Sequence, residues 1–333
     1  MRTESVTMGR VPTSSPLPPH LRGSAFGVRD SEWHGLSDKR LRGRDIDAPF
    51  HGVRSIGIDT RDIRGLCVAF EPLLVGSRVF CGATAAILLG MPLPLRLRTG
   101  RLLHVGTLDA RQPPRRRGVV GHRLTQGTRT IDVPGGFTVT DAASTWCQLA
   151  AELSREELTA VADYALSGVP LSGSRRSAPL CSRDELSAAI AEHGARVGVA
   201  KLRWALEHAR TGVDSAPETA LRLLLVEEHF TEPVVALSVL VERGTIILHP
   251  DLAWPELRVL LEYEGDGHRE SKRQFRADIR RREMFEAAGW RVIRVTADDL
   301  GPLRDEFVAR VHSVLASRVR DLALIARLPH QVQ

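Results

Sequence analysis

The sequence predicts a mixed α/β protein, in which an N-terminal α+β domain precedes a domain with the element order α-β-β-β-α-β. The first indication is the length of 333 residues, about twice that of a typical domain. The second is a composition of 43% hydrophobic and 26% charged residues, which excludes a largely disordered or fibrous chain. The third is the alternation of apolar runs and amphipathic segments after residue 214.

Changes in composition divide the chain into five parts. Residues 1–46 contain many Pro, Gly, Ser and Arg residues without a sustained period, so we expect a disordered leader there. Residues 47–168 form the predicted α+β domain. The segment 169–214 begins rich in Ser, Gly and Pro and is a predicted helical linker. Residues 215–318 hold the second domain, and 319–333 form a C-terminal tail.

Short motifs predict the elements of the first domain and the linker. Pro134-Gly135-Gly136 separates two apolar runs as a hairpin turn does, and Ser154 with Glu157 forms a capping box. The predicted elements are a buried helix (81–89), a strand (102–106), an exposed Pro- and Arg-rich connection (111–123), a hairpin (130–139) and helices over 141–153, 154–168, 182–194 and 199–210.

The second domain begins with a well-marked helix. In Ser215-Ala216-Pro217-Glu218, a Ser N-cap, an early Pro and a Glu three residues later each favour a first helical turn. Apolar runs separated by turn residues follow it. The predicted elements are a helix (215–229), three strands (234–240, 245–254 and 258–264), a basic helix (270–288), a strand (290–295) and a last helix (302–319).

Several classes of protein are excluded or disfavoured. Cys67, Cys81, Cys147 and Cys181 are far apart, which argues against a zinc ribbon or a disulfide framework and fits a reducing compartment. The most apolar stretch, 79–95, is broken by Gly and Pro, so we expect no membrane span and a cytoplasmic protein. A net charge of +6 favours a polyanionic partner, but only three of the 46 basic residues are lysines. Such an arginine bias is equally explained by the codon composition of a genome.

A predicted hairpin gathers carboxylates on one face. If its turn lies between Glu256 and Leu257, Asp251 stands opposite Glu262, and opposed residues of an antiparallel pair project from the same face. Because side chains alternate along a strand, Glu264 and His249 share this face. The other face is apolar and is made of Leu252, Trp254, Val259, Leu261 and Tyr263.

This arrangement of carboxylates predicts a metal site. Like charges facing each other destabilise a sheet unless something compensates them, and Mg²⁺ or Mn²⁺ does so with one or two carboxylates while keeping waters for a phosphate substrate. The following turn, Gly265-Asp266-Gly267-His268, adds a histidine beside the cluster. The alternative is a polar face whose carboxylates pair with arginines or extend into water.

The second domain resembles the family of very-short-patch-repair endonuclease-like domains, within the restriction-endonuclease-like (PD-(D/E)xK) superfamily. The resemblance covers roughly residues 215–318. The matching segments are His249-Pro250-Asp251-Leu252-Ala253-Trp254-Pro255-Glu256, Leu261-Glu262-Tyr263-Glu264-Gly265 with His268, then Gln274, Asp278 and Arg281, and Gly289-Trp290-Arg291-Val292-Ile293-Arg294. The family implies a restriction-endonuclease-like fold and Mg²⁺-dependent hydrolysis of DNA phosphodiester bonds.

The resemblance also assigns roles to single residues. Asp251 matches the metal-binding Asp of the superfamily, and Glu262 matches the acidic residue of the next strand. Glu264 stands where the broad superfamily has a lysine that helps to position or activate the attacking water, so His268 would take an acid/base or phosphate-contacting role. Glu218 matches the acidic residue of the first helix, although the capping box explains a Glu there equally well.

The basic helix 270–288 is a candidate DNA-binding surface. Lys272, Arg273, Arg276 and Arg280 recur at helical spacing on one side of it. A basic stripe beside a metal site suits contacts with backbone phosphates, which are independent of base sequence. The alternative is a solvated arginine face.

The first domain more weakly resembles the C-terminal region of AbiEi-type antitoxins. The matching segments are 81–86 with 89–94, 115–123 and 138–146. Such antitoxins usually begin with a winged-helix DNA-binding unit, and no helical pattern in residues 1–46 corresponds to one. The resemblance implies a possible toxin–antitoxin partner.

Two functions of different classes follow. The leading hypothesis is a Mg²⁺-dependent DNA endonuclease or nickase in DNA repair or phage defence, acting as a homodimer if it cuts both strands with one site per chain. The alternative is a non-catalytic DNA-binding or regulatory protein of antitoxin type with a decayed nuclease fold. An RNA or nucleotide hydrolase with the same metal chemistry is a third reading.

Overall fold

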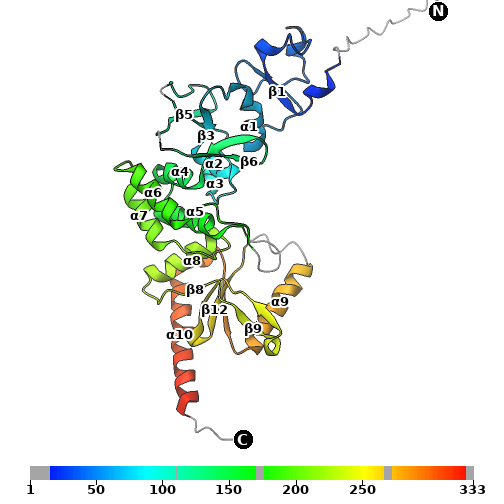
Figure 1. The fold of residues 1–333 in the computed structure, drawn as a ribbon. Helices are drawn as coiled ribbons and strands as arrows, with labels where there is room; N and C mark the ends of the chain where they lie inside the picture. The colour runs from blue at the N-terminus through cyan, green and yellow to red at the C-terminus, as the bar shows by residue number, and fades with distance from the viewer. Residues whose placement is uncertain (1–15, 110, 126, 170–175, 266–271, 328–333) are drawn as a thin grey trace, which may run out of the picture. The chain divides into compact units, whose positions relative to one another are not determined.

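The structure is a computed structural model that describes residues 16–109, 111–125, 127–169, 176–265 and 272–327 (Figure 1). For 272–275 and 324–327 it describes the backbone alone. Helices alternate with mixed sheets, which confirms the predicted mixed α/β class.

The chain divides into two compact units. The first contains Met1–Leu89 and Leu95–Asp141, and the second contains Gly90–Pro94 and Ala142–Gln333. We describe each unit by itself. Among the described residues, no helix combines the length and the apolar character needed to cross a bilayer.

The beginning of the first unit is folded. β1 (Ser24–Gly27) pairs antiparallel with β2 (Val53–Ile56). A small core of Leu21, Phe26, Leu36, Leu41, Ile46 and Ile56 lies beside this pair. The prediction of a disordered leader is therefore wrong for residues 16–46, while residues 1–15 lie outside the described chain. Leu21 and Leu41 sit in short 3₁₀ turns, and Phe26 and Ile56 sit in four-residue strands, so no single helical or strand period marks this segment in the sequence.

A five-stranded sheet forms the centre of the first unit, in the strand order β5-β4-β3-β7-β6. The predicted hairpin is confirmed as the antiparallel pair β6–β7, and Gly135 and Gly136 supply the positive φ values of its turn. The interpretation of 111–123 as a connection is wrong at its end, where β5 pairs parallel with β4. The elements are α1 (Ile63–Phe70), β3 (Arg78–Phe80), α2 (Gly82–Leu88), α3 (Leu95–Arg98), β4 (Leu103–Thr107), β5 (Val119–Arg123), β6 (Thr130–Val133) and β7 (Phe137–Thr140).

The second unit begins with four helices: α4 (Ala142–Gln148), α5 (Arg155–Ser167), α6 (Arg183–His193) and α7 (Val199–His208). The predicted capping boxes at the starts of α5 and α6 are both present, with Ser154 and Ser182 as N-caps. The segment that we predicted to be a helical linker supplies α6 and α7, which contact α4 and α5. Leu186 and Leu202 are fully buried there.

A four-stranded sheet with the order β13-β12-β11-β8 follows. β12 is antiparallel to β11 and parallel to β13. β9 and β10 form a separate antiparallel pair. The elements are α8 (Ala216–Glu227), β8 (Val234–Val235), β9 (Val239–Val241), β10 (Ile246–Leu248), β11 (Leu252–Trp254), β12 (Val259–Tyr263), α9 (Lys272–Ala287), β13 (Arg291–Val295) and α10 (Arg304–Arg327).

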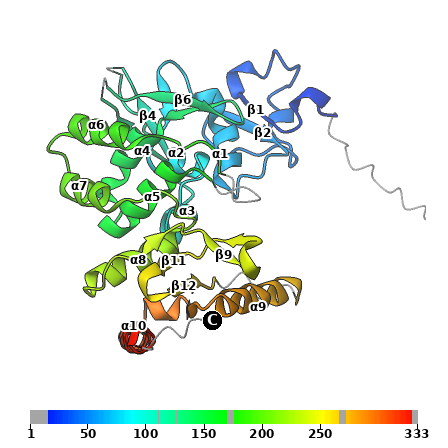
Figure 2. The ribbon, with the colours of Figure 1, turned by 60° about the horizontal axis from the view of Figure 1, so that its bottom comes forward.

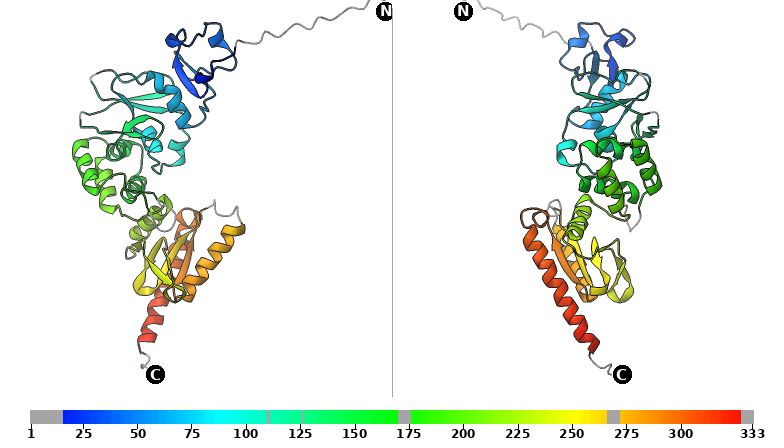
Figure 3. Two further views of the ribbon diagram at one scale, coloured as in Figure 1. Left: turned by 45° about the vertical axis from the view of Figure 1, so that its right-hand side comes forward. Right: turned by 90° about the vertical axis from the view of Figure 1, so that its left-hand side faces the viewer.

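Helices cover both faces of this sheet (Figures 2 and 3). Leu252, Trp254, Val259 and Leu261 pack with α8 and α10, which confirms the predicted apolar face. Ala253 and Leu260, on the opposite face, pack with β9 and with Phe285 of α9. The face that carries the carboxylates is therefore covered by α9 over part of its length.

Two predicted strands and the last helix have different limits in the structure. The strand 234–240 is divided into β8 and β9, and Ala236 between them has a φ of 53°. The strand 245–254 is interrupted around Pro250, which has no N–H to donate to a sheet. The last helix passes the predicted end at 319 and reaches Arg327, because neither Gly nor Pro occurs between Leu303 and Leu328.

Candidate active site at the β11–β12 hairpin

The hairpin has the predicted register. Leu252 faces Leu261 and Trp254 faces Val259, so the same register brings Asp251 opposite Glu262 at the open end of the hairpin. The 3₁₀ turn Pro255–Leu257 and Arg258, with a φ of 49°, connect the strands. Asp251 lies just before β11, and Glu262 is the fourth residue of β12.

Asp251 is half-buried and fixed by the neighbouring strand. Its Oδ2 accepts a hydrogen bond of 2.6 Å from the backbone N–H of Tyr263. Burial, followed by the negative charges of Glu218 and Glu262, raises the pKa of Asp251 to about 8, although the Tyr263 N–H and Arg281 act in the opposite direction. Three carboxylates from α8, β11 and β12 thus lie near enough to repel one another.

Glu218 belongs both to the helix cap and to this carboxylate group. Ser215 Oγ donates to its Oε1 at 2.8 Å, and the N–H of Asp214 donates to its Oε2 at 3.0 Å. Its side chain is buried. Burial raises the pKa of Glu218 to about 7, with smaller contributions from Glu262 and Asp163, while Ser215 and Arg176 lower it. The two explanations of Glu218 are therefore compatible.

Glu262 forms an ion pair with an arginine of α9. Arg281 Nε and Nη2 each donate to one Glu262 oxygen at 2.9 Å, and Nη2 also donates to the carbonyl of His249. The same guanidinium lies 5.2 Å from the ring centre of Phe285. A two-pronged pair of this kind holds a carboxylate strongly. For Glu262, the structure matches the alternative in which hairpin carboxylates pair with arginines.

Glu264 is directed toward the neighbouring strand. Both of its oxygens accept hydrogen bonds from Arg294 of β13, and its N–H donates to the carbonyl of Val295 at 2.7 Å. The strongest charges on Asp251 come instead from Glu218 and Glu262. His268 lies outside the described residues.

The donor chemistry of the site, which is made of carboxylates, suits a hard divalent cation. Among the described residues, no three His, Cys, Asp or Glu side chains are placed to hold one ion. Mg²⁺ needs only one or two carboxylates, which Asp251 and Glu262 provide. The pKa values of Asp251 and Glu218 are raised first by burial and then by the neighbouring carboxylates, and a bound cation would oppose both causes. Arg281 is a competing cation at Glu262.

The predicted DNA-binding residues lie on α9. Arg276 and Arg280 are exposed, and Arg280 is 3.6 Å from a carboxylate oxygen of Glu242. Lys272 is the first residue of α9. The side chains of Lys272 and Arg273 are outside the described part of the chain.

Sequence reasoning missed the arginine at the centre of the site. In the sequence, Arg281 stands out only as a matching residue of the family resemblance beside Gln274 and Asp278, because a helical period does not show which residue of another element it contacts. Asp163 and Arg176, which act on Glu218, are far from it in the sequence. Two buried polar residues on helices, Asp163 and Arg222, were the available signal.

Two curated proteins of Mycobacterium tuberculosis are similar to this chain. They are "Uncharacterized protein Rv2248" of strain ATCC 25618 / H37Rv and "Uncharacterized protein MT2308" of strain CDC 1551 / Oshkosh. Each is 27% identical over 252 residues, which cover 75% of this chain and 86% of the relative. No family model and no solved structure matches the chain. The functional argument therefore rests on the site itself.

Proposed function

We propose that the protein is a Mg²⁺-dependent DNA endonuclease or nickase that hydrolyses phosphodiester bonds in the cytoplasm, in DNA repair or phage defence. The observation that carries this proposal is the opposition of Asp251 and Glu262 across the β11–β12 hairpin, with the buried Glu218 of α8 among the charges that raise the pKa of Asp251. Mutually repelling carboxylates are costly to a fold, and a functional site is where such a cost is retained.

Asp251 and Glu262 would hold the cation, and Glu218 would add negative charge from the start of α8. The bound ion would polarise a phosphoryl oxygen and lower the pKa of a bound water. Arg281 would keep Glu262 oriented through its two hydrogen bonds to that carboxylate. Glu264 and His268 would be further catalytic residues, and Glu264 would also be a ligand of the metal ion.

The DNA backbone would contact the exposed side of α9. Arg276 and Arg280 extend from this helix, and the first turn adds Lys272 and Arg273 from the sequence. Contacts of this kind bind phosphates without reading bases, so they support affinity and not sequence preference. Cutting both strands would require two copies of the chain, since each carries one such site.

Incubation of the full chain with supercoiled plasmid tests the proposal. With Mg²⁺ or Mn²⁺ we expect conversion to nicked or linear DNA, and with EDTA no conversion. Asp251→Asn should lose at least about 100-fold in rate, because it removes a metal ligand. Glu306→Gln, an exposed change on α10, is the matched control and should cut like wild type. Intact plasmid across salt and pH, or equal cutting by Asp251→Asn, would refute the proposal.

The ion pair between Arg281 and Glu262 favours a second candidate, a non-catalytic DNA-binding or regulatory protein of antitoxin type. In that case the arginine would replace the metal permanently. Such a protein would retain DNA in EDTA, and Mg²⁺ or Mn²⁺ would neither bind at micromolar concentration nor stabilise the fold. A metal titration in the absence of DNA separates the two candidates.

A further inference from the structure

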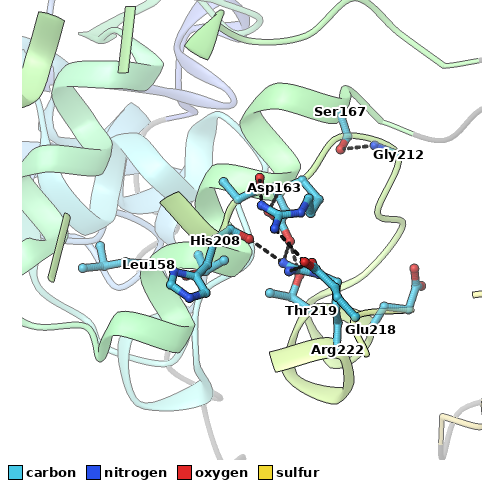
Figure 4. A network of polar contacts seen from close by, with 12 residues as sticks. Leu158, Asp163, Ser167, His208, Gly212, Glu218, Thr219 and Arg222 are labelled. Carbon is cyan, nitrogen blue, oxygen red and sulfur yellow. Dashed lines mark hydrogen bonds and ion pairs between the residues drawn. The ribbon is translucent and has the colours of Figure 1, made fainter. Parts of the chain in front are cut away.

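A buried carboxylate of α5 holds the start of α8. Asp163 is 1% exposed and accepts three hydrogen bonds (Figure 4). Its Oδ1 accepts from the backbone N–H of Arg210 at 2.6 Å, and its Oδ2 accepts from Thr219 Oγ1 at 2.8 Å and from Arg222 Nη2 at 3.2 Å. One side chain therefore joins α5 to the segment before α8 and to α8 itself.

Arg222 is the cationic partner of this carboxylate. Its side chain is as buried as that of Asp163, and it also donates to Glu232 and to the carbonyl of His208, both at 2.8 Å. A fully buried ion pair keeps a single geometry, because leaving either charge without its partner is strongly unfavourable. The rotation and the height of α8 relative to α5 are thereby fixed.

The residues held by Asp163 flank Glu218 on α8. Thr219 is the next residue along the helix, and Arg222 lies one turn further on the same side as Glu218. The turn before α8 is held from the same region. Ser167 Oγ accepts from the N–H of Gly212 at 2.9 Å. Arg176 donates to the carbonyl of Gly212 and to the side chain of Asp214. The backbone N–H of Asp214 in turn donates to the Glu218 carboxylate.

We propose that Asp163 is a positioning residue for Glu218, so that α5 is a structural part of the nuclease-like site and not of a separate helical module. The inference rests on the proposed function for its catalytic consequence. Asp163 acts through the hydrogen-bonded turn and through its charge. The charged groups that act on the Glu218 carboxyl are Asp163 from α5, Arg176 from the segment after it, Asp251 before β11 and Glu262 on β12.

The test uses the full chain with Asp163→Asn, followed by hydrogen exchange and DNA cleavage. Amides of residues 212–219 should exchange at least about tenfold faster than in wild type, while those of β11 and β12 keep their protection. The turnover number should fall about 10- to 100-fold with KM unchanged, because Glu218 is displaced and the DNA-contacting surface is not. The pKa of Glu218 followed by carboxyl NMR should fall, since a neighbouring negative charge is removed.

Arg210→Ala is the matched control. It removes a charge that pairs with Glu232 but keeps the backbone N–H that donates to Asp163, so exchange and turnover should stay at wild-type values. If Asp163→Asn does not fold, Thr219→Val removes one of the three hydrogen bonds and keeps the buried charges, and about threefold faster exchange over 212–219 is expected.

The inference would be overturned if exchange over 212–219 were unchanged in both Asp163→Asn and Thr219→Val. It would also be overturned if the Asp163→Asn protein folded and kept a wild-type turnover number and Glu218 pKa. A merely structural role would lower the melting temperature and speed exchange in all elements of the second unit alike, without confining the faster exchange to residues 212–219 and without lowering the turnover number of the folded protein. If wild-type protein cuts no DNA, the proposed function fails, whereas the exchange and NMR results still decide whether Asp163 positions Glu218.

Discussion

The guanidinium of Arg281 donates to both oxygens of Glu262, at 2.9 Å each, and thereby neutralises one of the three carboxylates at the hairpin. Asp251 and Glu218 are left with raised pKa values. A divalent cation would stabilise the deprotonated form of these two carboxylates, but it must share Glu262 with an arginine. The balance between the two cations determines whether the site binds metal.

The first prediction concerns this competition. Arg281→Gln should bind Mn²⁺ about tenfold more tightly than wild type, because a positive charge leaves the partly buried neighbourhood of Glu262 and Asp251. Isothermal titration without DNA measures the effect. Arg282→Gln, one residue along α9, breaks an exposed pair with Glu286 and should leave the affinity unchanged. Equal affinities of wild type and Arg281→Gln would show that no metal uses Glu262.

The second prediction concerns pH. Asp251 and Glu218 have pKa values of about 8 and about 7 in the folded protein, above ordinary values of 3.8 and 4.5. The folded state therefore binds more protons between pH 4 and 8, so these two groups lower the free energy of unfolding as pH rises through that range. Urea unfolding at pH 5.5 and 8 measures this effect. Between these two pH values, the free energy of unfolding should decline less in the Glu218→Gln, Asp251→Asn double variant than in wild type.

Added Mg²⁺ should reduce the same decline in wild type, because the ion binds the deprotonated carboxylates. The double variant should not respond to Mg²⁺. A decline of equal size in wild type and the double variant would mean that the two carboxylates ionise normally.

The third prediction concerns the buried ion pair between Asp163 and Arg222. Arg222→Met should lower the free energy of unfolding by about 3–5 kcal/mol, because Asp163 is left buried without its cation. Arg210→Ala, which removes a partly exposed partner of Glu232, should cost about 1 kcal/mol or less. Chemical denaturation checks both values, and similar losses for the two variants would contradict the prediction.

The fourth prediction concerns the limits of the folded module. A fragment that begins at Ser215 lacks Asp163, so the buried Arg222 loses the negative charge of its partner. We therefore expect this fragment not to fold and to give an NMR spectrum without dispersed signals. A fragment that begins at Ala142 retains α5 and should fold. A well-folded fragment from Ser215 would show that α5 is dispensable.

The fifth prediction concerns DNA. The Arg276→Gln, Arg280→Gln double variant should reduce the slope of log K against log salt by about 2, because two phosphate contacts are lost. Binding measured in Ca²⁺ by fluorescence anisotropy avoids cleavage. Arg291→Gln, an exposed change on β13, is the control and should keep the wild-type slope. An unchanged slope in the double variant would remove α9 from the DNA interface.

Local signals predicted much of this fold. The capping boxes at Ser154 and Ser182 and the turn at Pro134-Gly135-Gly136 each bring their own short-range hydrogen bonds, so a few neighbouring residues specify the element. The register that brings Asp251 opposite Glu262 followed from placing the turn between Glu256 and Leu257, and the alternation of apolar residues agrees with it, because a one-residue slip would turn Leu261 away from the core face.

The features that sequence did not predict depend on contacts between distant segments. The small core around Phe26 has no single period, since its residues come from short strands, 3₁₀ turns and the loops between them. Arg281 and Asp163 reach the site from helices whose rotation is set by packing, and such a rotation is not visible in a one-dimensional pattern. Charge composition indicated many arginines but not which of them would meet a carboxylate.

The tight turn Pro255–Leu257 limits changes of length in this hairpin among relatives. Inserting or deleting one residue there would move Glu262 to the face covered by α8 and α10 and leave Asp251 where it is. Substitutions between the two carboxylates are therefore tolerable wherever size and polarity are kept, whereas changes of length are not. The spacing from Asp251 to Glu262 should be the most constant property of this hairpin across homologues, more constant than any side chain inside it.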